Sequence, residues 1–307
     1  MTRDAQLLLL AVVFSGLLFS LAAFFSRRAR TAARRRFARL LAVPLAFAFG
    51  LLAWGRLIEP RWIEVTRTRV AVASAPPLRL TVLGDFHAGR IGADIIERAV
   101  RRANETDPDV VLLAGDYVTG YDLSAPKARI LEALRPLRAK RGVFAVLGNH
   151  DSEPYTVPTP RAADITRFLE GLGFTVLNNR WVEPAPGVIL IGLAEVQSRN
   201  IDAARAFRDA PEGARIVVTH DWHGLAEAGI GRFDLAVTGH THGGQICVPL
   251  LGRCPFAKNN QPFVAGLFDW PAGGKLFVNR GIGESAVLMR VASRPEVSVI
   301  EIAPASR

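Results

Sequence analysis

The sequence predicts an α/β protein preceded by membrane-spanning helices. Apolar runs of strand length alternate with helix-like stretches after residue 78, and two longer apolar runs come before residue 59. With 307 residues, 50% of them hydrophobic and 21% charged, the chain can bury a large core, which excludes a disordered or low-complexity protein. Only two cysteines are present, so no disulfide framework holds the fold together.

The first apolar run, from Gln6 to Phe25, carries no charge and has about the twenty residues that a helix needs to cross a bilayer. A cleaved signal peptide is the alternative interpretation, but its apolar part is usually shorter and ends at small residues. Here the run ends in Phe24-Phe25 and arginines follow. We therefore expect a first membrane span at about residues 6–25.

A second apolar run begins at Leu40 and reaches about residue 58 if Arg56 extends to the membrane surface. Pro44 and Gly50 weaken this run, so one span followed by an amphipathic or re-entrant cytoplasmic segment is the alternative. We expect a second span at about 40–58, a basic loop at 26–39 and a membrane anchor over residues 1–58.

Arginines dominate the N-terminal segment and set its expected orientation. Seven lie in the loop at 26–39, which should stay in the cytoplasm, so two spans place the following domain outside the cytoplasm and one span keeps it inside. Residues 1–70 hold 12 of the 38 basic residues and 3 of the 28 acidic ones, which leaves the remainder close to neutral. The formal charge of +10 therefore does not indicate a nucleic-acid partner, and none is expected.

The rest of the chain alternates between strand-like and helix-like segments. Residues 59–78, which end in Ala75-Pro76-Pro77, are expected to be a linker, and residues 79–303 a single domain. The expected strands are Leu78–Leu83, Val110–Ala114, Val143–Leu147, Val188–Leu193, Arg215–Thr219, Leu235–Thr238, Lys275–Val278 and Val297–Ile302. The expected helices are Ala93–Asn104, Ala125–Leu137 and Arg161–Leu172. Because the later half is rich in strands, a mixed sheet is predicted.

Side chains that can bind metals follow five of these strands, at the point where each strand ends. They are Asp85 and His87, Asp116, the Asn149-His150-Asp151 triplet, His220, and His240 with His242. Ligands bind at strand ends in open α/β sheets, and all six histidines of the chain, His223 included, lie in these segments or within three residues of them. Carboxylates, imidazoles and an amide without thiolates suit Zn, Fe or Mn. The donors are too many for one ion and fit two ions that share a carboxylate, which could clamp a phosphoryl group.

The series Asp85-x-His87, Gly115-Asp116, Gly148-Asn149-His150-Asp151, His220 and Gly239-His240-x-His242 resembles the calcineurin-like metallophosphoesterase superfamily, in the family's order over residues 79–302. The extended forms Gly239–Gln245 and Val278–Gly283 look like its bacterial branch of membrane-anchored or exported phosphodiesterases, in which some relatives cleave UDP-diacylglucosamine.

This resemblance implies two stacked mixed β-sheets flanked by helices, a four-layer sandwich, around two divalent ions (Mn, Fe or Zn). It assigns Asp85, His87, Asp116 and His242 to the first ion, and Asp116, Asn149, His220 and His240 to the second, with Asp116 as the bridge. His150 would stabilise charge or protonate the leaving oxygen, with Asp151 as its orienting partner or else as a cap of the following turn. His223 carries no family role, and Arg90 is either a phosphate contact or simply an exposed arginine.

The sequence thus indicates a phosphoesterase anchored in the bacterial inner membrane, its catalytic domain outside the cytoplasm. It would hydrolyse a phosphodiester or pyrophosphate bond through a metal-bound hydroxide, with a lipid-linked or nucleotide-lipid substrate. The alternatives are a non-catalytic scaffold, which would usually lack ligands, and a nuclease of the same fold, against which the near-neutral domain argues.

Two further features keep two interpretations each. Cys247 and Cys254 form either a disulfide suited to an oxidising compartment or two buried thiols. The apolar residues after Gln245 either pack onto the domain or form a wall that accepts a lipid chain: Val248, Leu250, Leu251, Phe256, Phe263, Leu267, Phe268 and Trp270.

Overall fold

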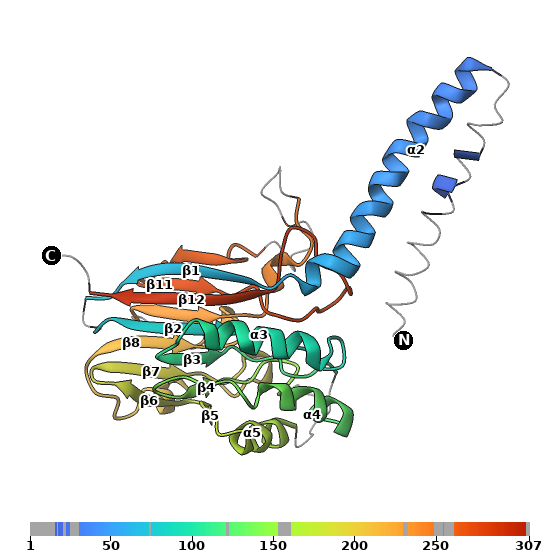
Figure 1. The fold of residues 1–307 in the computed structure, drawn as a ribbon. Coiled ribbons are helices and arrows are strands. Elements are labelled where there is room, and N and C mark those ends of the chain that lie inside the picture. Colours follow the sequence, from blue (N-terminus) through green and yellow to red (C-terminus); the bar gives the residue numbers. More distant parts are fainter. Residues whose placement is uncertain are drawn as a thin grey trace.

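The computed structural model describes residues 16, 18–20, 23–24, 31–73, 75–120, 123–152, 161–229, 233–248, 254 and 261–304. Most of the first expected span, 6–25, lies outside these residues. Helix α2 (Ala32–Ala53) runs on through a π-helical turn at Trp54–Ile58 and a 3₁₀ turn at Glu59–Arg61, and it projects from the rest of the chain (Figure 1). Residues 32–39 of the basic loop expected at 26–39 are therefore helical.

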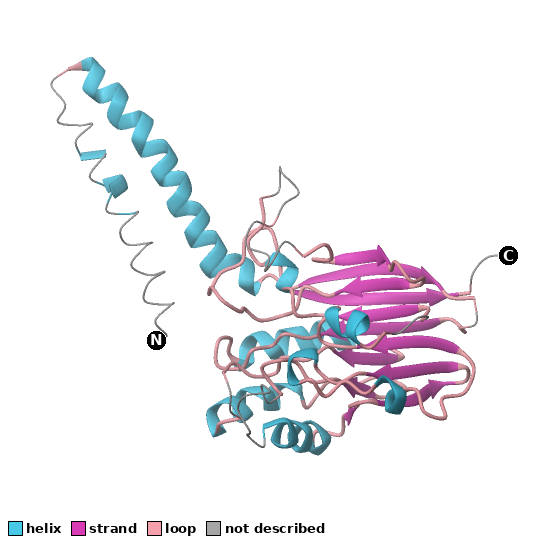
Figure 2. Cartoon of the chain, turned by 180° about the vertical axis from the view of Figure 1, so that it is seen from behind, coloured by secondary structure: helices cyan, strands magenta, loops and turns pink. Residues whose placement is uncertain are grey.

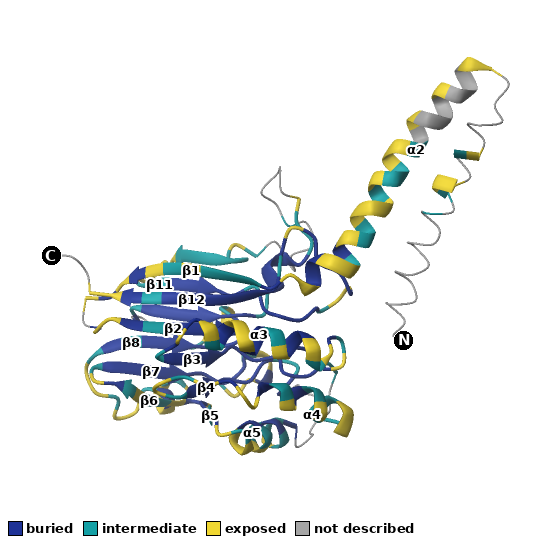
Figure 3. Ribbon diagram, viewed as in Figure 1, coloured by how far each residue is buried: buried dark blue, intermediate teal, exposed yellow. Residues whose placement is uncertain are grey.

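Pro44 lies inside α2 and does not end the helix, so the second apolar run is one continuous helix. Within the described residues, the stretch Ala42–Arg61 is long and apolar enough to cross a membrane by length and composition, and only 11% of its most apolar window is buried. This stretch overlaps the second expected span, 40–58, and its place in a membrane stays a prediction. Figure 3 shows that most residues of this helix are exposed or half-buried, whereas most residues of the strands are buried.

Two six-stranded mixed sheets form the domain. The first has the order β1 (Glu64–Ala71), β12 (Glu296–Ala303), β2 (Leu78–Leu83), β3 (Val110–Leu113), β4 (Val143–Ala145) and β5 (Thr175–Val176). The second has the order β10 (Gly266–Asp269), β11 (Lys275–Val278), β9 (Leu235–Thr238), β8 (Ala214–Val218), β7 (Val188–Gly192) and β6 (Arg180–Ala185). Neighbours are parallel except at β12–β2, β10–β11 and β6–β7.

The two sheets stack face to face, with helices on both outer faces. Alternate residues of a strand point to opposite faces, so on β3 Leu112 packs between the sheets while Val111 and Leu113 pack under the helices. The helices α3 (Ala93–Glu105), α4 (Ala125–Leu131) and α5 (Arg161–Gly171) cover the first sheet. The short helices α6 (Ala203–Ala206) and α7 (His223–Glu227) cover the second. The predicted four-layer sandwich is confirmed.

The segment expected to be a linker, 59–78, instead contains the edge strand β1, which pairs in parallel with β12 along its whole length. Its sequence, EVTRTRVA, is mostly polar because much of this strand is exposed, so it lacks the continuous apolar run of a buried strand. The strands β5, β6 and β10 escaped prediction too, and the helix expected to reach Leu137 ends at Leu131.

Most of the described apolar residues after Gln245 pack onto the domain, whereas Val248 is exposed. Phe263, Phe268 and Trp270 lie against the outer core of the second sheet, and the ring of Trp222 contacts Phe263 edge-on at 5.3 Å between centroids. Leu250, Leu251 and Phe256 lie outside the described residues.

Candidate metal centre

All five ligand-bearing segments meet at one end of the domain. Strands β2, β3 and β4 are parallel neighbours in one sheet, and β8 and β9 are parallel neighbours in the other, so their carboxyl ends open toward common loops. The loops gather at the end of the sheets from which α2 departs (Figure 2).

Five of the candidate ligands have a left-handed backbone, with φ between 48° and 69°: Asp85, His87, Asp116, His240 and His242. This conformation is uncommon for residues other than glycine and is typical of functional sites held in place by their surroundings. The chain turns sharply after β2, β3 and β9, so that side chains on these three loops point to the same place.

A first cluster consists of Asp85, His87 and His242. The Nε2 atoms of His87 and His242 lie 3.0 Å apart, and Nε2 of His242 lies 3.5 Å from Oδ1 of Asp85. The ligand atoms of the three residues all lie within 4.8 Å of one another, close enough to hold one ion.

A second cluster consists of Asp116, His220 and His240, with Asn149 beside it. Nε2 of His220 lies 3.3 Å from Oδ2 of Asp116, 3.1 Å from Nδ1 of His240 and 3.1 Å from Oδ1 of Asn149. The same Oδ2 of Asp116 lies 3.4 Å from Nε2 of His87 in the first cluster. Asp116 therefore stands between the two clusters.

In the second cluster, the negative charge of Asp116 outweighs burial and raises the pKa of His220 well above its usual range. In the first cluster, burial sets the electrostatics. It lowers the pKa of His87 to about 3 and, aided by the nearby His87 and Arg290, holds the pKa of His242 well below its usual range. Burial also raises the pKa of Asp85 to about 7. Neutral imidazoles with available lone pairs, converging on buried carboxylates, are the donor set that a divalent transition-metal ion prefers, so these residues fit metal binding.

Comparison with known proteins decides the family. The calcineurin-like phosphoesterase family matches residues 78–244. The phosphodiesterase YaeI of Escherichia coli is 33% identical over 88% of this chain and 98% of its own length. The chain belongs to the calcineurin-like metallophosphoesterases. It is a metal-dependent phosphoester hydrolase.

Two further relatives carry informative names. The UDP-2,3-diacylglucosamine pyrophosphatase LpxG of Chlamydia trachomatis is 24% identical over 80% of this chain and 91% of its own. A transmembrane protein with a metallophosphoesterase domain from Danio rerio is 30% identical over 73% of this chain and 52% of its own.

In this metallophosphoesterase, the contacts of His150 and Asp151 favour different roles for the two residues. The half-buried His150 donates its backbone N–H to Oδ1 of Asp116 (2.8 Å), and its ring lies 4.9 Å from that of His87 between centroids. Asp151 is fully buried, and its carboxylate accepts from the backbone amides of Gly148 (2.9 Å), Tyr117 (2.8 Å) and Val118 (3.2 Å). The geometry therefore favours the turn-capping interpretation of Asp151 over that of a partner for the His150 imidazole.

Glycines make room for the ligands of the metallophosphoesterase site. A Cβ atom on Gly148 would lie 2.2 Å from Oδ1 of Asp116, and one on Gly239 would lie 2.7 Å from Oδ2 of Asp85. Gly281, with φ at +67°, packs against the same aspartate, where a Cβ would lie 2.5 Å from the Cβ of Asp85. The loop after β11 thus forms the back wall of the first cluster.

Sequence reasoning missed Arg290, which is fully buried behind His242. Its guanidinium donates to the carbonyl oxygens of Gly283, Ser293, Arg280 and His242. The Oγ of Ser293 donates to the carbonyl of His242 as well (3.0 Å). An isolated arginine in a loop gives no periodic signal, so the sequence alone could not place it.

Helix α2 and the two turns that continue it to Arg61 are called the α2 segment, and the end of this segment packs against the same loop. Gly55 accepts a hydrogen bond from the backbone of Arg290 (2.9 Å), and the buried Glu59 accepts from Trp54 Nε1 (2.8 Å) and from the backbone of Ser293 (2.7 Å). The loop that supports His242 is therefore also the loop against which the end of the α2 segment packs.

The remaining candidates fall near the site. The Nδ1 atom of His223 lies 2.8 Å from Oδ1 of Asp221, whose other oxygen lies 3.6 Å from Nε2 of His240. The half-buried Arg90 lies close enough to His87 for its charge to lower the pKa of that imidazole. Cys247 and Cys254 form a disulfide against Gly244, directly beside the loop of His240 and His242.

Proposed function

We propose that this protein is a membrane-anchored phosphodiesterase or pyrophosphatase that uses two divalent metal ions on a lipid-linked substrate. The observation that carries the proposal is the position of Asp116, whose Oδ2 lies 3.4 Å from His87 in one cluster and 3.3 Å from His220 in the other. A carboxylate between two groups of donors is what a pair of ions requires.

The residues divide into two ligand sets. Asp85, His87, Asp116 and His242 would hold one ion, and Asp116, Asn149, His220 and His240 the other. Bound there, the ions would supply Lewis acidity toward phosphoryl oxygens and an activated water. Mn, Fe and Zn all suit this donor set.

His150 acts on the substrate in this proposal. Its backbone is fixed through Asp116 and its ring is half-buried, so the imidazole can reach a bound phosphoryl group from beside His87. It would donate a proton to the leaving oxygen or stabilise the charge that develops there. Asp151 holds the turn that presents it, as a positioning residue.

Replacement of the shared ligand tests this proposal. Asp116→Ala should abolish hydrolysis of a soluble phosphodiester and lower the bound metal, since both sites lose a ligand. Metal analysis that finds two ions retained per chain would refute the bridging role. A panel of phosphomonoester, phosphodiester and nucleotide-lipid substrates then separates the substrate classes; the name of the chlamydial relative supports the last of these.

The proposed location is the bacterial inner membrane, with the catalytic domain outside the cytoplasm. The apolar stretch Ala42–Arg61 supports the anchor, and the disulfide between Cys247 and Cys254 is typical of an oxidising compartment. Alkaline phosphatase fused after Arg307 should be active, whereas a fluorescent protein fused there should stay dark. A fluorescent, phosphatase-negative result would place the site in the cytoplasm.

A further inference from the structure

A basic groove lies between the end of the α2 segment and helix α3, and it shares no residue with the metal centre. Residues 57–63 form one wall and residues 98–105 of α3 form the other, around a volume of about 650 Å³. Such a volume is in the range of small-molecule sites. We call it the α3 groove.

Four arginines line the α3 groove against one acid: Arg61, Arg98, Arg101 and Arg102, with Glu105. The spacing along α3 places its three arginines on neighbouring positions of the helix surface. Arg98 pairs with Asp94 at 3.0 Å and Arg102 with Glu105 at 3.4 Å, but Arg101 makes no ion pair within the described residues. The groove therefore keeps an excess of positive charge, and guanidinium groups favour phosphate oxygens.

Beside Arg61, the wall of the groove formed by residues 57–63 presents three exposed apolar side chains. Leu57, Ile58 and Trp62 are 59%, 47% and 47% exposed; the first two lie in the last turns of the candidate membrane span, and Trp62 follows it directly. Arg294 places its guanidinium 4.0 Å from the centre of the Trp62 ring, so another cation lies at the same level. Tryptophan and arginine at the end of a spanning helix are typical of the lipid headgroup region.

We propose that the α3 groove binds the headgroup phosphate of an anionic phospholipid in the leaflet that surrounds the α2 segment. The inference rests on the membrane anchoring of the proposed function, but not on its catalytic part. The arginines recognise the phosphate, and the apolar wall at Leu57 and Trp62 favours a phosphate that carries acyl chains over a soluble one. A bound lipid would hold the domain close to the membrane, with α3 toward the headgroups.

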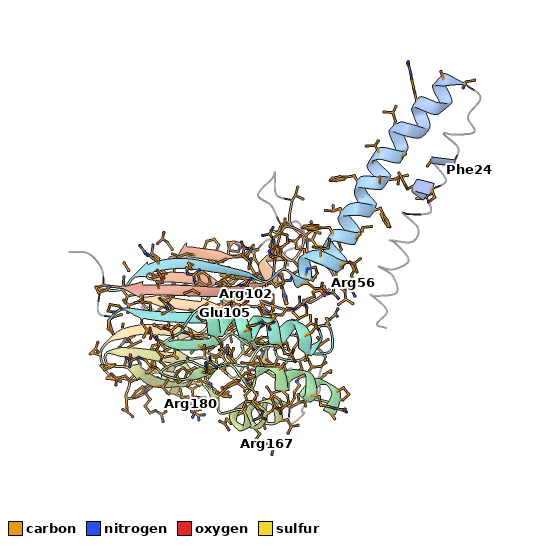
Figure 4. All side chains as sticks on the ribbon, viewed as in Figure 1. Phe24, Arg56, Arg102, Glu105, Arg167 and Arg180 are labelled. Carbon is orange, nitrogen blue, oxygen red and sulfur yellow. A yellow bond between two sulfur atoms is a disulfide. The ribbon has the colours of Figure 1, made fainter. Side chains whose placement is uncertain are left out.

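The full-length protein in mild detergent, titrated with phosphatidylglycerol and followed by native mass spectrometry, tests the inference. The variant R101Q/R102Q removes one arginine with an ion pair and one without. The variant R129Q/R167Q is its control, because Arg167 also pairs three residues away on its helix and Arg129 bonds only the Ala125 carbonyl among the described contacts. In Figure 4, Arg102 lies on α3 near the level of the α2 segment, and Arg167 lies at the far side of the domain.

We expect R101Q/R102Q to bind phosphatidylglycerol about 25-fold more weakly than the unmodified protein, at roughly fivefold for each arginine near a membrane surface. The control should bind phosphatidylglycerol as the unmodified protein does. The affinity for phosphatidylcholine should be the same in the unmodified protein and in both variants. Equal binding by R101Q/R102Q and the unmodified protein, or an equal loss in the control, would overturn the proposal. So would displacement of the lipid by an equal concentration of glycerol 3-phosphate, which would identify a free-phosphate site.

Two parallel measurements separate this inference from the proposed function. Hydrolysis of a soluble phosphodiester should be the same in all three proteins, because none of these arginines lies in the metal centre. Retention of the chain in carbonate-washed membranes reports on anchoring alone.

Discussion

Gly148→Ala isolates the steric basis of the metal centre, because it adds one methyl group and changes no ligand or charge. The backbone of Gly148 is outside the left-handed region, so alanine is compatible with it. The new Cβ, however, would lie 2.2 Å from Oδ1 and 2.4 Å from the backbone nitrogen of Asp116, whereas Cβ atoms essentially never approach closer than 3.0 Å. Asp116 or the turn carrying Asn149 and His150 must therefore move.

Relief of these contacts needs a displacement on the order of 1 Å, and such a displacement at a catalytic group costs about 10²-fold in rate. Overpacking of a buried site costs about 1–3 kcal/mol of unfolding free energy, so the domain should stay folded. We expect at least a 10²-fold loss of phosphodiesterase activity, a lower manganese content and a smaller rise of the unfolding temperature on addition of manganese.

Gly171→Ala is the matched control, since a Cβ there would meet nothing within 4 Å. This position ends α5, where alanine should be neutral or stabilising by up to about 1 kcal/mol. Full manganese content and activity within twofold in Gly148→Ala would refute the steric argument, because the ligands would then tolerate a contact that the geometry forbids.

The remaining predictions concern His150 and the disulfide. His150→Ala should keep the metal content of the unmodified protein but lower turnover by about 10²-fold or more, as measured by metal analysis and steady-state kinetics. Loss of metal would identify His150 as a ligand, in line with its proximity to His87 and Asp116. Replacement of both Cys247 and Cys254 with serine should lower the unfolding free energy by about 2–3 kcal/mol, because the short loop between them is no longer closed in the unfolded chain. Denaturant unfolding measures this, and an unchanged midpoint would show that the disulfide does not restrain the loop.

Local patterns were enough to single out the side chains that the structure brings together in the two clusters. Asp85, Asp116 and His240 each follow a glycine at the end of a largely buried, mostly apolar strand, and both features are visible in a few consecutive residues. Because parallel strands end at one edge of a sheet, the donors could be expected to meet before any contact was known. The apolar run from Leu40 likewise predicted a long helix from composition alone.

Edge strands and supporting contacts needed the tertiary structure. β1 is half exposed, so its pattern resembles that of a linker until β12 pairs with it, more than 200 residues away. Asp151 follows His150 directly and could be read as its catalytic partner. Its carboxylate instead accepts hydrogen bonds from the backbone amides of Tyr117 and Val118, which the neighbouring strand brings to it.

Arg290 and Glu59 are the clearest examples of residues whose roles only the tertiary structure reveals. Both are buried charges at positions with no distinctive neighbours in the chain, and they gain their roles from the carbonyl of His242 and the amide of Ser293. The sequence by itself determined which residues could bind metal and which segments were apolar, since these are properties of short segments. The tertiary structure decided which groups support them, because buried polar atoms bond to whatever partner the packing of distant segments brings within reach.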